Sequence, residues 1–102
     1  MAFINGPVPE SFERRVTATA REFERDLRQA WPVVEGGAAA LRFCLHDGAQ
    51  SLVIDIEPAG VRRLGLFELP QLDVRYRFGP GDEAARRALL ARLDRAMQKG
   101  GG

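Results

Sequence analysis

The chain has very little of the material from which catalytic and metal sites are usually built. Its 102 residues include one cysteine and one histidine, and Ser11 and Ser51 are its only serines. A single cysteine excludes an internal disulfide and any multi-cysteine metal site. The sequence also has no histidine-containing metal spacing and no glycine-rich phosphate loop of standard spacing. We therefore expect no cofactor, no metal and no catalytic residue, and we do not favour an enzyme that acts alone.

Charge of one sign and long apolar runs are also lacking. The 15 basic and 14 acidic residues give a formal net charge of +1, which produces no overall field toward nucleic acid or an anionic membrane. No run approaches the roughly 18 apolar residues that a membrane helix needs, and residues 1–7 lack the pattern of a secretion signal. The lone Cys44 is typical of a reducing compartment. Together these absences predict a cytoplasmic protein for which nucleic acid and membrane are not partners.

The length and composition are those of one ordinary globular domain. The chain is 45% apolar and 28% charged, and about a hundred residues support a single core. We expect one domain over residues 1–102. Gly6, Pro7 and Pro9 indicate an extended lead-in over residues 1–9, and the terminal glycines indicate a frayed tail over residues 99–102.

The first regular segment has the apolar spacing of a helix. Large apolar residues recur at steps of four or seven, which is one or two helical turns, at Phe12, Val16, Phe23, Leu27 and Trp31. The positions between them carry charges of both signs, as a solvated helix face does. Ser11 is a candidate N-cap, and Pro32 disfavours helical geometry at the residue before it. These features predict a helix from about Ser11 to Trp31.

After the loop at residues 35–37 the apolar residues recur at every second position, which is typical of strands. The alternation and the turn residues predict four strands, over residues 41–46, 52–57, 61–69 and 71–78. The third of these is the least regular. Asp82 then provides an N-cap for a final helix whose apolar stripe includes Ala85, Leu89, Leu93 and Met97.

Connections this short force neighbouring strands to pair antiparallel, because a parallel crossover needs a dozen or more residues. An alternating sheet must bury one face, and the two terminal helices carry the remaining apolar stripes. The sequence therefore predicts an α+β fold of the order α-β-β-β-β-α. In this fold a four-stranded antiparallel meander sheet is covered on one face by both terminal helices.

The other sheet face should be polar, and it is the first candidate interaction surface. Its predicted residues are Arg42, His46, Asp55, Arg63, Phe67, Asp73, Arg75 and Arg77. The arginines suit phosphate or carboxylate groups, yet the acidic residues among them are typical of the cross-strand pairs of a solvated face. One aromatic residue is too few for the stacking by which sheets bind RNA. We expect a small cytoplasmic accessory or protein-interaction domain of bacterial type that acts through this face or a strand edge.

The partner in this interpretation is another protein or a second copy of the chain, so a homodimer is one expected form. The alternative is a small-ligand-binding domain with an aromatic pocket between sheet and helices, lined by Trp31, Phe43 and Tyr76. The same aromatics would also serve as ordinary core. Cys44 and His46 share one strand face, but same-face neighbours lie roughly 6–7 Å apart, too far for the hydrogen bond that activates a nucleophile.

Overall fold

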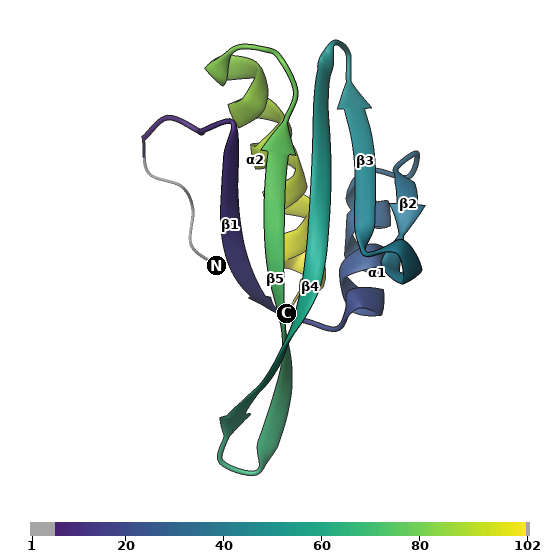
Figure 1. Ribbon diagram of the computed structural model, residues 1–102, viewed down its shortest axis with the longest axis vertical. Coiled ribbons are helices and arrows are strands. Elements are labelled where there is room, and N and C mark those ends of the chain that lie inside the picture. Colours follow the sequence, from purple (N-terminus) through teal and green to yellow (C-terminus); the bar gives the residue numbers. More distant parts are fainter. Residues whose placement is uncertain (1–5, 102) are drawn as a thin grey trace.

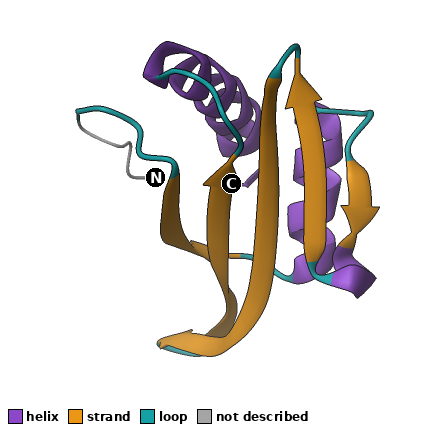
Figure 2. Ribbon diagram, turned by 45° about the horizontal axis from the view of Figure 1, so that its top comes forward, coloured by secondary structure: helices purple, strands orange, loops and turns teal. Residues whose placement is uncertain are grey.

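The computed structural model describes the backbone of residues 6–101 and the side chains of residues 6–97. A five-stranded antiparallel sheet has both helices behind it, on one face (Figures 1 and 2). The elements are β1 (Ser11–Thr17), α1 (Ala20–Ala30), β2 (Glu35–Gly37), a 3-10 turn (Ala38–Ala40), β3 (Arg42–Asp47), β4 (Gln50–Leu64), β5 (Phe67–Phe78) and α2 (Glu83–Gly101). The α+β class and the antiparallel sheet are confirmed. The four strands, the helix-first order and the simple meander are wrong, because the strand order is β1-β5-β4-β3-β2.

Residues 11–17 form the edge strand β1 and not the start of a helix. This strand pairs antiparallel with β5, and its inward positions are Phe12, Arg14 and Val16. A four-residue step between two apolar residues fits a helix and a strand equally well. The charged Arg14 between them hid the alternation that would have distinguished the two.

The first helix begins at residue 20 because Thr19 provides a complete N-terminal cap. The Thr19 hydroxyl accepts from the Glu22 N–H at 3.1 Å, while the Glu22 carboxylate accepts from the Thr19 N–H at 2.8 Å. This reciprocal capping box satisfies two backbone donors that a helix start leaves open. The helix ends near Trp31, as the sequence predicts.

The segment predicted as a loop at residues 35–37 is the short edge strand β2, paired with β3. Gly36 has a φ of +97°, and a Cβ at this position would collide with the Arg42 carbonyl oxygen. Only glycine combines that backbone conformation with so close an approach. The glycine pair that indicates a loop in the sequence therefore allows a tight strand pairing.

The predicted strand over residues 61–69 is a hairpin. Gly65, with a φ of +59°, and Leu66 form a two-residue turn between β4 and β5. Glycine in the left-handed region at the first turn position is the signature of a type II′ hairpin turn. Beyond the rest of the sheet the two strands pair only with each other, and they project as a twisted hairpin at the lower end of the molecule (Figure 1).

Two predicted strands end at residues 57 and 69, directly before Pro58 and Pro70, yet β4 continues through Pro58 and β5 through Pro70. The Phe78 N–H donates to the backbone carbonyl oxygen of Glu10, which precedes β1. The backbone N–H and C=O groups of the even-numbered residues of β5 therefore point toward β1, and those of the odd-numbered residues point toward β4. Pro70 is one of the even-numbered residues and lies beyond the end of β1. Its missing N–H therefore faces no neighbouring strand, and Pro58 likewise lies beyond the end of β3.

The hydrophobic core fills the space between the sheet and the helices. It contains Leu27 of α1, Leu89 and Leu93 of α2, and Phe43, Leu45, Leu52, Ile54, Ile56, Leu72, Val74, Tyr76 and Phe78 of the strands. These are inward positions of the predicted helical and alternating patterns. None of the described helices is long and apolar enough to span a membrane.

The predicted lead-in and tail can be compared with the structure only at residues 6–9 and 99–101, since residues 1–5 and 102 lie outside the described residues. Within the lead-in, Val8 is buried and its N–H donates to the Glu83 carboxylate at 2.8 Å. The Arg86 guanidinium in turn donates to the Val8 oxygen at 2.9 Å. The described part of the lead-in is therefore attached to the first turn of α2, and the helix assignment runs to Gly101.

A buried ion pair joins the first strand to the last helix. The Arg14 guanidinium donates to both Asp94 carboxylate oxygens, at 2.7 and 3.1 Å. Only 12% and 6% of the two side chains are exposed. The same guanidinium lies 5.3 Å from the centre of the Phe12 ring and 5.4 Å from that of Tyr76. Arg14 occupies an inward strand position because this partner compensates its charge.

Candidate interaction surface

Six of the eight predicted surface residues lie together on the sheet face opposite the helices, called here the open face. Strand alternation and register place them there: Arg42 and His46 on β3, Asp55 on β4, and Asp73, Arg75 and Arg77 on β5. The other two, Arg63 and Phe67, lie on the projecting hairpin. The open face is therefore smaller than the predicted surface.

Asp55 is the centre of an ionic cluster on this face. Its carboxylate accepts from the Arg42 guanidinium and from the Arg77 guanidinium, each at 2.6 Å. Partial burial alone would raise the pKa of the Asp55 carboxyl, yet the two guanidinium groups hold that pKa below its ordinary value. The two arginines therefore share a single carboxylate.

Two further ion pairs of the open face join β1 to β5. Arg15 donates to both oxygens of Asp73, at 2.8 and 3.1 Å, and Arg75 lies 3.3 Å from the Glu13 carboxylate. Both contacts join residues that lie directly opposite each other on β1 and β5. Each guanidinium of the face thus has a carboxylate partner, which is typical of a solvated sheet surface and offers little to a phosphate.

Cys44 and His46 lie two residues apart on the open face, as the sequence predicts. Cys44 is half-buried and His46 is exposed beside the turn that ends β3. No hydrogen bond of the described residues joins the two side chains. Among the described residues, no three His, Cys, Asp or Glu side chains come together as ligands of a metal ion.

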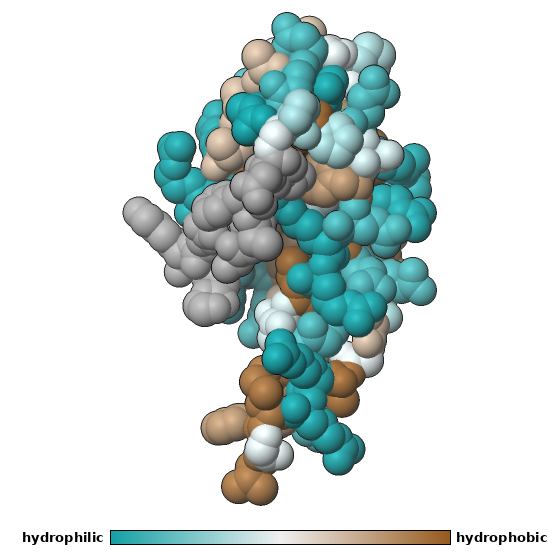
Figure 3. Space-filling model, turned by 90° about the vertical axis from the view of Figure 1, so that its left-hand side faces the viewer, coloured by the Kyte–Doolittle hydropathy of each residue, from teal (hydrophilic) through white to brown (hydrophobic). Residues whose placement is uncertain are grey.

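The second surface is the hairpin arm, defined as residues 61–70 at the end of β4 and the start of β5. Its exposed apolar residues are Val61, Leu64, Leu66 and Phe67, and the last two are 100% and 70% exposed. Figure 3 shows these apolar side chains gathered at the lower end of the molecule, where Figure 1 places the arm. The arm thus carries four of the six large apolar side chains that are exposed among the described residues.

Strand register divides the arm into two faces. Leu64 lies opposite Phe67, and Arg62 lies opposite Leu69, so one face is mainly apolar with one guanidinium. The other face is mixed in character, with one apolar residue, one proline and two opposite charges: Val61, Pro70, Arg63 and Glu68. Arg63 and Phe67 therefore point to opposite faces of the arm.

The three residues of the predicted aromatic pocket all belong to the core, with exposed fractions of 6% or less. Tyr76 stacks on the Phe12 ring with centroids 4.8 Å apart, and Phe43 packs on Phe23 at 5.8 Å. The Arg92 guanidinium lies 4.1 Å above the Trp31 ring. Protein groups thus occupy the contacts that a small ligand would need.

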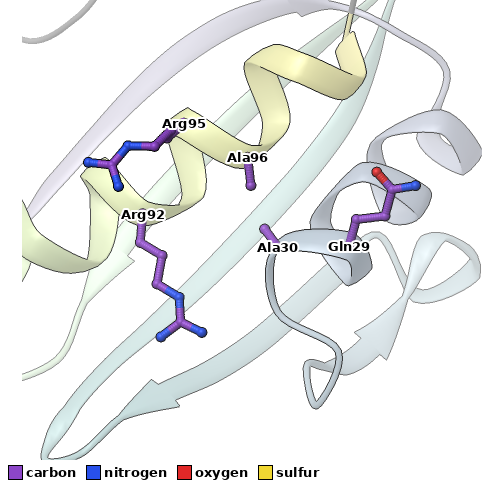
Figure 4. Close-up of a pocket in the computed structure, with 5 residues that line it drawn as sticks. All are labelled: Gln29, Ala30, Arg92, Arg95 and Ala96. Atoms are coloured by element: carbon purple, nitrogen blue, oxygen red, sulfur yellow. The ribbon is translucent and has the colours of Figure 1, made fainter.

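One surface hollow of about 420 Å³ lies between α1 and α2 (Figure 4). It is lined by Gln29, Ala30, Arg92, Arg95 and Ala96, and by none of the three predicted pocket residues. Figure 4 shows the two guanidinium groups extending in different directions, both away from the glutamine amide. A ligand site needs polar groups that converge, and these do not.

Tyr76 is the only tyrosine of the chain, so its ionisation can be followed directly. Burial raises the pKa of its phenol to about 12. A tyrosine in the unfolded chain ionises near pH 10, so the folded state is fully favoured below that pH and loses stability as pH rises toward 12. We expect tyrosinate absorbance to appear with a midpoint near pH 12, and the urea midpoint of unfolding to fall between pH 10 and 12. A titration midpoint near pH 10 in the folded protein would contradict this expectation.

The hairpin arm is absent from the predicted fold because Gly65 falls within the predicted strand over residues 61–69. A glycine flanked by apolar residues, two positions from the next strand, was the available signal for a hairpin. No local pattern in the sequence indicates that Arg14 and Asp94, which are 80 residues apart, form a buried ion pair. Comparison of the chain with protein-family models, with curated proteins and with solved structures finds no match.

Proposed function

We propose that this chain is a protein-binding domain that contacts its partner through the hairpin arm. The observation that carries the proposal is the full exposure of Leu66 beside the largely exposed Phe67. Burying each large apolar side chain would contribute roughly 1.5–3 kcal/mol, and the arm places several of them together. Contiguous apolar groups of this kind mark interaction surfaces on otherwise polar proteins.

The arm suits this role better than the open face does. A partner placed on the open face would have to remove water from ion pairs such as Arg42–Asp55 and Arg15–Asp73, which are already satisfied. A partner placed on the arm removes water from apolar carbon instead. Of the two surfaces expected from the sequence, the polar face and a strand edge, we therefore favour the strand edge. The cytoplasmic location stays a prediction. Small-ligand binding is not favoured, because the predicted aromatics are packed in the core.

The test is affinity capture from an extract of the source organism with the native chain and with a Leu66→Ser/Phe67→Ser variant. The control is Val33→Ser, since Val33 is 77% exposed and lies outside the arm. We expect the native chain and the control to retain the same proteins and the arm variant to lose at least one of them. Identical retention by all three chains would refute the proposed function. Their thermal unfolding should agree, because exposed positions contribute little to stability.

A further inference from the structure

We propose that the hairpin arm binds an extended acidic segment of a partner protein, which adds as a strand along the free edge of β4 at residues 61–64. This inference rests on the proposed function and specifies its partner. Three features of the arm support it: the direction of its unpaired backbone groups, the proline on its other edge, and the charge of β4.

The unpaired backbone groups of β4 in the arm belong to Val61 and Arg63. In a two-residue hairpin the flanking pair, here Leu64 and Phe67, exchanges hydrogen bonds, and pairs then alternate between bonded and non-bonded. Val61 and Arg63 are in non-bonded pairs, so their N–H and C=O groups point away from β5. The position of Pro70 opposite Val61 agrees, because proline has no N–H to donate to that pair.

Only one edge of the arm is suited to strand addition. On the β5 edge the outward residues are Glu68 and Pro70, and the proline removes a donor that an added strand would need. On the β4 edge both outward residues keep their N–H groups. The register between β3 and β4 ends with Arg42 opposite Asp55, so no described strand covers this edge of β4 along the arm.

The charge of β4 selects an acidic segment. Arg62 pairs with no carboxylate among the described side chains, and Arg63 pairs only with Glu68, at 3.2 Å in an exposed position. Exposed pairs of this kind contribute little and exchange easily. An added strand with carboxylates opposite Arg62 and Arg63 gains two favourable cross-strand pairs. Apolar residues on either side of those carboxylates would lie opposite Val61 and Leu64.

The same charges disfavour a second copy of the chain as the added strand. Antiparallel pairing of β4 with its own copy about an axis at residue 62 or 63 sets an arginine against its own equivalent. An axis between the two residues sets Arg62 against the arginine equivalent to Arg63. Like charges directly opposite each other are destabilising. The geometry therefore favours a different chain over a homodimer at this edge.

The test uses a fluorescent, end-blocked peptide with the central sequence Val-Glu-Glu-Val and a matched peptide with Val-Lys-Lys-Val. We expect the acidic peptide to bind about tenfold more tightly, and an Arg62→Gln/Arg63→Gln variant to lose this preference. The acidic peptide should also slow amide hydrogen exchange at Val61 and Arg63 and leave the Glu68 amide unchanged. Equal affinities for the two peptides, or slowed exchange at Glu68 in place of Val61 and Arg63, would overturn the inference.

The outcomes separate this inference from the proposed function. If the Leu66→Ser/Phe67→Ser variant loses a captured protein while the acidic peptide does not bind, strand addition is wrong and protein binding by the arm stands. If capture is also unchanged, both are wrong. A dimer in analytical ultracentrifugation that this arm variant abolishes would make a second copy the occupant and overturn the acidic partner.

Discussion

Replacing Asp94 by alanine is expected to lower the free energy of unfolding by about 3–5 kcal/mol. The substitution leaves the Arg14 guanidinium without its carboxylate in a position where only 12% of the side chain is exposed. A buried charge without a partner carries its full desolvation cost, whereas in the intact pair the attraction between guanidinium and carboxylate offsets much of that cost. For a domain of this size the loss is a large part of the total stability. Urea unfolding followed by tryptophan fluorescence, which reports on Trp31, measures it.

A double variant tests whether the loss comes from the unpaired charge. Arg14→Met combined with Asp94→Leu replaces both partners by apolar groups, and such replacements of buried pairs are often neutral or stabilising. We therefore expect the double variant to be clearly more stable than Asp94→Ala alone. Additive losses from the two positions would show that the ion pair is not the reason for burying Arg14.

Phe43→Ala is expected to cost about 3–5 kcal/mol, because it removes a fully buried ring from the centre of the core. The Phe43 side chain is 0% exposed and packs against the ring of Phe23. Phe67→Ala is the matched substitution, since it changes the same residue type on the hairpin arm. Its effect on unfolding should stay within about 0.5 kcal/mol, because an exposed ring contributes little to the folded state.

The comparison of the two variants bears on function as well as stability. If Phe67→Ala weakens partner capture and leaves the thermal midpoint unchanged, the ring serves binding and not folding. A loss of stability comparable to that of Phe43→Ala would show that the arm packs on the chain itself in solution. That result would remove the exposed apolar surface on which the proposed function rests.

The sequence predicted the elements whose patterns are local. Leu27 and Leu89 lie on helical stripes that face the core, and the alternation of Val74 and Tyr76 with charged residues correctly predicts residues 71–78 of β5. Helical and alternating periodicities arise within a few residues, so they can be recognised without knowing what lies alongside. Six of the eight predicted surface residues share one face for the same reason.

For the aromatic residues, local periodicity predicts which layer they occupy but not whether they line a pocket. Trp31, Phe43 and Tyr76 were correctly placed between the sheet and the helices, but their position alone does not distinguish a lined pocket from a filled core. That distinction depends on whether other side chains occupy the space. Phe12, Phe23 and Arg92 do so, and they come from three different elements.

The sequence by itself determined the α+β class, the antiparallel character of the sheet and the polarity of the open face. Tertiary structure decided the identity of β1, because the strand pattern is interrupted by Arg14 and becomes intelligible only with Asp94, which lies 80 residues away. It also decided that the strands continue through Pro58 and Pro70, since each proline lies where the neighbouring strand has ended. A residue's periodicity is a local property, whereas the partner that compensates a charge or covers a strand edge is supplied by distant parts of the chain.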